Sequence, residues 1–119
     1  MIRDYRDLLV WQRAMELVKA IYSATATFPA AEAYGLTSQI RRAAVSVPSN
    51  IAEGHGRENE GDFRRFLAIA RGSLAELQTQ LILAGDLGFA DQKAIAIHLE
   101  KSEEVARMIR GMQKSLANK

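Results

Sequence analysis

The residues best suited to bind a partner are arginines concentrated in the middle of the sequence. The guanidinium group forms paired hydrogen bonds with phosphate or carboxylate groups, and clustered cations are typical of nucleic-acid-binding surfaces. Four acids, Glu53, Glu58, Glu60 and Asp62, lie in the same stretch, so salt bridges within the protein are the alternative role. We take six arginines as candidate contacts to the backbone of RNA or DNA: Arg41, Arg42, Arg57, Arg64, Arg65 and Arg71.

The stretch from Gly54 to Gly61 has the glycine content of a phosphate-binding loop but lacks its sequence. Neither the Gly-Lys-Ser/Thr ending nor the dinucleotide spacing is present, and no strand is predicted before it. The remaining candidate is a phosphate held by Arg57 and the start of the following helix. The acids at positions 58, 60 and 62 oppose an anion there, and the helix dipole explains their presence.

Histidine and cysteine usage argues against metal and thiol chemistry. The chain has no cysteine and only two histidines, His55 and His98. Di-metal helix bundles need a glutamate three positions before a histidine, and neither histidine has one. We expect His98, which falls on an apolar helix face, to be a hydrogen-bonded core or interface residue. The sequence therefore predicts no metal, no cofactor and no enzymatic activity.

Length and composition indicate one globular domain covering residues 1–119. Apolar residues make up 48% of the chain and charged residues 25%, which excludes an intrinsically disordered protein. The charged start and the lack of a long apolar run predict a cytoplasmic protein with no membrane segment. The net charge of +2 permits a nucleic-acid partner without requiring one.

Apolar residues recur every three or four positions, which predicts an all-α protein. Polar connections separate four helices, so the simplest topology is an up-down-up-down antiparallel four-helix bundle. We expect Asp7, Asn59 and Asp91 to cap helix starts, Pro48 to kink the second helix, and Gly54 to end it. The predicted helices cover about 8–25, 36–52, 60–87 and 91–116.

Two sets of residues suggest contacts beyond a single bundle. The first helix has a second apolar stripe, and the third helix has a face of small residues that allows another helix to approach closely. A close contact within the chain is the alternative for the small face. A contact between subunits is the second interpretation. The predicted interface residues are Val10, Ala14, Leu17, Ile21, Ala68, Gly72 and Ala75.

Three segments, Tyr5–Trp11, Tyr34–Gly54 and Phe66–Leu77, closely resemble the bacterial four helix bundle protein family, also called the 23S rRNA intervening-sequence proteins. The resemblance implies a small cytosolic bundle that assembles as a ring-shaped homopentamer. The two faces described above fit such a cyclic assembly, which uses two different surfaces of each subunit. Some members are encoded within sequences that interrupt large-subunit ribosomal RNA genes. The family is also similar to retroelement accessory proteins, which are pentameric barrels that bind nucleic acid and a reverse transcriptase. The characteristic segments of the family include Arg41, Arg42, Arg57 and Arg71.

Two functions are therefore compared. In the first, a homo-oligomer binds the backbone of RNA or DNA through rows of arginines, without reading sequence. In the second, the oligomer is a protein-interaction or scaffold module that does not bind nucleic acid, and its arginines form salt bridges. The position of the arginines on the folded chain distinguishes the two. Convergence on one exposed face favours the first function, and pairing with Glu53 or Glu76 across subunits favours the second.

Overall fold

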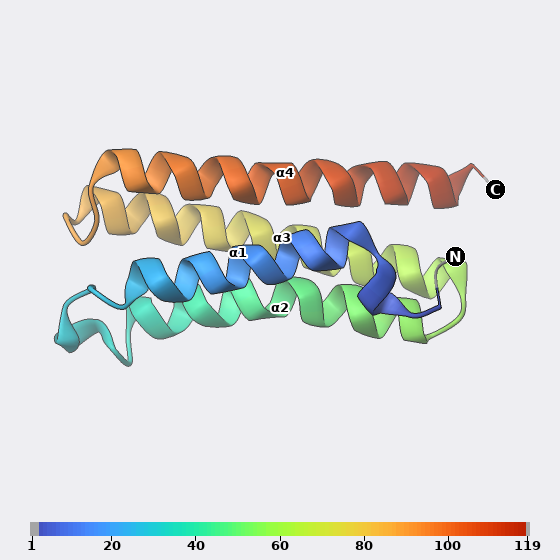
Figure 1. Ribbon diagram of the computed structural model, residues 1–119, viewed down its shortest axis with the longest axis horizontal. Helices are drawn as coiled ribbons and strands as arrows, with labels where there is room; N and C mark the ends of the chain where they lie inside the picture. Colours follow the sequence, from blue (N-terminus) through green and yellow to red (C-terminus); the bar gives the residue numbers. More distant parts are fainter. Residues whose placement is uncertain (1–2, 119) are drawn as a thin grey trace.

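Four long helices make up most of the computed structural model, which describes residues 3–118 (Figure 1). Successive helices run in opposite directions and form an elongated antiparallel bundle measuring 46 × 22 × 22 Å (Figure 1). The most extensive contact is between α2 and α3, and α1 and α4 close the other side. The prediction of an antiparallel four-helix bundle is confirmed. In chain order the elements are the 3-10 helix η1 (Tyr5–Asp7), α1 (Leu9–Thr25), the 3-10 helix η2 (Ala30–Glu32), α2 (Leu36–Gly56), α3 (Glu60–Asp86) and α4 (Gln92–Ala117).

Two of the predicted helix caps are present. Asn59 accepts a hydrogen bond from the Asp62 backbone N–H at 2.9 Å, and Asp91 accepts one from Ala94 at 2.8 Å. Each side chain satisfies a donor that the first turn of a helix leaves unpaired. Asp7 does not cap α1, because it belongs to η1 and accepts the Arg3 backbone N–H at 2.8 Å instead.

Helix α2 is longer than predicted and continues through both Pro48 and Gly54. Side chains bond carbonyls near the proline: Ser49 donates to Val45 O at 2.8 Å, and Asn50 donates to Ser46 O at the same distance. The prediction that Gly54 ends the helix is wrong. The predicted polar loop beginning at Gly54 is correspondingly shorter and follows Gly56.

Gly54 has a packing role instead of a terminating one. A Cβ atom at this position would lie 2.6 Å from the Phe66 Cβ of α3 and 3.1 Å from the Phe63 ring. Real Cβ atoms essentially never come within 3.0 Å of such a neighbour, so only glycine lets α2 and α3 approach this closely. Gly54 is buried, whereas Gly56 two positions later is exposed with open space around it.

The inner stripe of α1 belongs to the core of the single chain. Its four predicted interface residues are at most 3% exposed, because α1 packs against both α2 and α4. The prediction that these residues form a subunit interface is therefore wrong. Periodicity showed two apolar stripes on α1, but the stripe that is left half-exposed is the other one, which contains Trp11, Met15 and Val18. The four core residues are Val10, Ala14, Leu17 and Ile21.

Replacing Gly54 with alanine should destabilise the fold. The added methyl group overlaps Phe66, so we expect a loss of about 1–3 kcal/mol in the free energy of unfolding. Gly56→Ala is the matched control, because its added methyl group enters open space. The same substitution replaces a poor helix former with a good one, so it should not destabilise α2. Urea unfolding followed by circular dichroism measures both. Equal stabilities for the two variants would contradict the close approach at Gly54.

Candidate nucleic-acid interface

Arg41 is bound to the end of α1 and is not a free cation. Its Nε donates to Thr25 Oγ1 at 2.8 Å, and its Nη2 donates to the Tyr22 carbonyl at 3.2 Å. The guanidinium also lies over the Tyr22 ring, with Cζ 4.5 Å from the ring centroid. A cation at a helix C-terminus interacts favourably with the helix dipole and satisfies terminal carbonyls. Arg41 therefore joins α1 to α2.

The guanidinium groups of Arg57 and Arg65 both lie over the Phe66 ring. Their Cζ atoms are 5.2 and 4.7 Å from the ring centroid. Arg57 also forms a 3.0 Å ion pair with Glu53, and Arg65 a 3.8 Å ion pair with Asp62. Both guanidinium groups remain on the surface, but each already has an acid beside it.

Arg64 and Arg71 lie where α3 meets α4. Gln113 of α4 links them, since its amide N donates to the Arg64 carbonyl at 3.4 Å and its oxygen accepts from Arg71 at 3.0 Å. Gln113 is neutral, so this contact leaves the charge of Arg71 uncompensated. Within residues 3–118, Arg64 forms no ion pair.

The antiparallel arrangement places the first half of α3 beside the second half of α4 (Figure 1). Residues 62–73 and 103–117 together contain six basic and three acidic side chains, a net charge of +3, while the rest of the chain carries −1. The cations of α4 follow a spacing of three and four, so they share one face. We call the following exposed residues the basic face: Arg64, Arg71, Arg107, Arg110 and Lys114.

A groove of about 340 Å³ runs between the two helices within this face. Ala68, Gly72 and Ala75 line it on α3, and all three are exposed. Arg71 and Arg110 line the same groove. The structure thus brings the predicted small-residue interface and one of the predicted nucleic-acid contacts to the same place.

Glu103 is the acid of this groove. It accepts hydrogen bonds from Arg110 at 2.9 Å and from Gln78 at 3.3 Å. The Arg110 hydrogen bond, followed by that of Gln78, lowers the pKa of the Glu103 carboxyl. Glu103 is therefore ionised at neutral pH and offsets Arg110, whereas Arg71 has only an amide partner.

Arg42 of α2 lies apart from the other candidates, on the surface where α2 and α3 meet. It is exposed and lines a polar groove of about 300 Å³ with Gln39, Glu76 and Gln80. The six predicted arginines therefore do not form one site. The six do not include Arg107, Arg110 and Lys114, because their spacing alone is explained by the helix dipole and their proximity to Arg64 and Arg71 depends on helix pairing.

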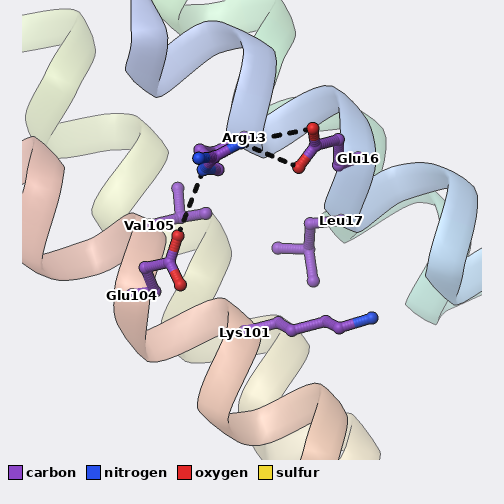
Figure 2. A pocket seen from close by; sticks show the side chains of 6 residues that line it. All are labelled: Arg13, Glu16, Leu17, Lys101, Glu104 and Val105. Carbon is purple, nitrogen blue, oxygen red and sulfur yellow. Dashed lines mark hydrogen bonds and ion pairs between the residues drawn. The ribbon is translucent and has the colours of Figure 1, made fainter.

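A second charged cluster lies between α1 and α4 and is electrically balanced. Figure 2 shows Arg13 between Glu16 on its own helix, at 3.3 Å, and Glu104 on α4, at 3.4 Å. Lys101 lines the same pocket of about 290 Å³, together with Leu17 and Val105. Two cations and two carboxylates leave no net charge, so this cluster links two helices and does not attract a polyanion.

Two kinds of feature are absent from the described part of the chain, a metal-binding cluster and a membrane-spanning helix. No cluster of three or more His, Cys, Asp or Glu side chains placed to hold a metal ion occurs within residues 3–118. In that same range, no helix has the length and apolar character needed to cross a membrane.

Replacing Arg41 and its neighbour Arg42 should have different effects on stability. Arg41→Gln loses two hydrogen bonds and the contact with the Tyr22 ring, so we expect a loss of about 1–3 kcal/mol in the free energy of unfolding. Arg42→Gln removes the same charge from an exposed position and should stay within about 0.5 kcal/mol of the unmodified protein. Chemical denaturation of the two variants checks this. A similar loss for both would show that Arg41 has no special structural role.

Comparison with known proteins places this fold in a recognised group. The model of the family described as 23S rRNA-intervening sequence protein matches residues 6–111. No curated protein sequence matches the chain. A crystal structure from Bacteroides thetaiotaomicron, described as a protein with unknown function from the S23 ribosomal protein family, superposes with a TM-score of 0.80 at 20% identity. The match covers 89% of this chain and 99% of that one, and it shows the shared fold. The chain belongs to the family of 23S rRNA-intervening sequence proteins.

Proposed function

We propose that this is a non-enzymatic cytoplasmic protein that binds the backbone of RNA or DNA as a homo-oligomer. The observation that carries the proposal is the basic face, where cations from two antiparallel helix halves gather around one groove. The regional net charge of +3 is larger than that of the whole chain. Such a concentration of cations raises the local potential for a polyanion even when the total charge is small.

The geometry of the groove suits a phosphate backbone better than base edges. Arg64 and Arg71 are seven residues apart, which corresponds to about 10 Å along a helix axis, and the same spacing separates Arg107 from Lys114. Two parallel rows of cations can therefore contact several phosphates at once. The proposed contacts fix position and carry no sequence information.

The family description supports a nucleic-acid role. It connects members of the family with 23S rRNA-intervening sequences. For this chain, that connection is part of the proposal, and it agrees with the choice of a polyanion as the partner of the basic face.

We also propose that the protein assembles through two different surfaces, as a ring requires. One is a largely apolar groove of about 330 Å³ between α1 and α2, lined among others by Trp11, Met15 and Val45. The other is the outer face of α3, where Ile69, Gly72 and Leu83 share one side at helical spacing and are exposed. Ala68 and Ala75 border this face. The family resemblance favours five subunits.

The second candidate function is a protein-interaction module that does not bind nucleic acid. The apolar groove between α1 and α2 favours it, because this surface also suits a partner protein. The ion pairs of Arg57 with Glu53 and Arg65 with Asp62 are further support, since they show arginines engaged within the chain. The two functions are distinguished by the basic face, which binds RNA or DNA in the first and does not in the second.

The basic face should control binding to RNA. We expect fluorescently labelled single-stranded RNA of about 30 nucleotides to bind at low salt and to dissociate as salt rises. The double variant Arg64→Gln/Arg71→Gln removes two cations, so the slope of log K against log salt should fall by about 2. Fluorescence anisotropy across a salt series measures both quantities.

The matched control is Arg13→Gln combined with Lys101→Gln. These two substitutions also remove two positive charges, but from the balanced cluster between α1 and α4 (Figure 2). RNA binding should therefore be nearly unchanged. Equal losses in the two double variants would show a nonspecific effect of net charge. Absence of binding at every salt concentration would reject the nucleic-acid proposal in favour of the protein-interaction module.

The outer face of α3 should control assembly. Gly72→Leu places a side chain into open space, so the single chain should still fold while docking of a second copy is blocked. We expect analytical ultracentrifugation to show an oligomer for the unmodified protein and smaller species for Gly72→Leu. Gly111→Leu is the control, because it makes the same change in open space on α4. An unchanged oligomer in Gly72→Leu would mean that subunits meet elsewhere.

A further inference from the structure

A pocket lies at the end of the bundle where α1 finishes and α4 begins, which is the end opposite the termini in Figure 1. Its volume is about 270 Å³. Apolar side chains from three helices and two connections form most of the lining, and the polar groups come from the end of α1, the connection after it, and the N-cap and second turn of α4. The apolar lining consists of Ala24, Phe28, Leu81, Ala90, Ala94 and Ile95, and the polar lining of Ser23, Thr27, Asp91 and His98.

The walls of this pocket are held in place without a ligand. The Phe28 ring is 8% exposed and packs against Phe89 of the α3–α4 connection, with ring centroids 5.9 Å apart. Asp91 is fixed as the N-cap of α4 by its hydrogen bond from Ala94. Ile95 is 4% exposed and anchors the first turn of α4 to the core. A preformed, largely apolar cavity with a few polar groups is the usual form of a small-molecule site.

His98 is the chemically distinctive residue of the pocket. Its Nδ1 atom is buried and has no hydrogen-bond partner among the described residues. The expectation was a hydrogen-bonded core or interface histidine, and within the single chain the core alternative is wrong for this atom. Desolvation, followed by the nearby positive charge of Lys101, lowers the pKa of His98, so the ring is neutral at neutral pH.

The proton of the neutral ring is best placed on Nε2. A buried N–H group without an acceptor is rarer in proteins than a buried acceptor without a donor. Placing the proton on Nε2 leaves only a lone pair on the buried Nδ1, and it makes Nε2 the donor available to a ligand. The charged groups near the ring are Lys101 and Asp91 of α4, while the lining from α1 and α3 is uncharged.

We propose that this pocket binds a small, uncharged, largely apolar molecule with a carbonyl oxygen that accepts a hydrogen bond from His98. The apolar lining supplies the binding surface, and the volume suits a molecule with one aromatic ring. The Asp91 carboxylate at the rim disfavours anionic ligands. This site is independent of the basic face and of the RNA proposal.

Two matched probes test the proposal on the unmodified protein. Acetophenone carries a carbonyl oxygen, and ethylbenzene has nearly the same shape without one. Methyl resonances of Leu81 and Ile95 in ¹H–¹³C NMR spectra report occupation of the pocket. We expect saturable shifts with acetophenone and an affinity about fivefold lower for ethylbenzene, which corresponds to one ordinary hydrogen bond. No saturable shift with either probe would overturn the site, and equal affinities would overturn the role of His98.

Three variants localise the effect. His98→Phe should bind both probes equally, because the donor is lost while the apolar wall remains. Ala94→Leu should fill the pocket and abolish binding of both probes. Gly111→Ala, in open space further along α4, should bind like the unmodified protein. Retained discrimination in His98→Phe, or retained binding in Ala94→Leu with its helical circular dichroism intact, would contradict the assignment.

Discussion

The close approach of α2 and α3 at Gly54 is the constraint on which the rest of the structure depends. The absent side chain lets Phe66 pack directly against the α2 backbone, which fixes the position of α3 along α2. Further along the same pair, the hydroxyls of Ser46 and Ser73 lie 2.7 Å apart, and Asn50 donates to Ser46 Oγ at 2.9 Å. An apolar contact and a polar one therefore specify the same register.

That register also decides which side chains of α3 face α4. Successive residues of a helix are rotated by about 100°, so sliding α3 by one residue would turn Arg64 and Arg71 away from Gln113. Phe66 takes part in both roles. Phe66 packs against the α2 backbone at Gly54. Its ring also contacts the guanidinium groups of Arg57 and Arg65. Core packing and surface charge are thus connected through one aromatic residue.

Periodicity and capping chemistry were sufficient to predict the helices, because both are local. The caps at Asn59 and Asp91 and the continuous apolar seams follow from residues close together in the chain. Gly54 could not be understood this way, because its significance depends on Phe66 twelve residues later in another helix. The stripes of α1 show a similar limit. Spacing reveals that two apolar stripes exist, but only the packed neighbours determine that the one containing Leu17 is buried and the one containing Trp11 is half-exposed.

In the candidate site too, the sequence identifies the arginines, but only helix packing shows which of them are used in folding. Arg41 and Arg42 are identical in type and adjacent in sequence, yet only Arg41 meets the end of α1. On α4, Lys114 lies in the last turn, where a cation interacts favourably with the helix dipole, and Arg110 forms an ion pair with Glu103, so folding alone gives a reason for both. Arg64 lies near the N-terminus of α3, where a cation gains nothing from the dipole, and it forms no ion pair within residues 3–118. A charge that folding does not explain is stronger evidence for a partner than one that folding does, so Arg64 supports the polyanion proposal more strongly than Arg110 or Lys114 does.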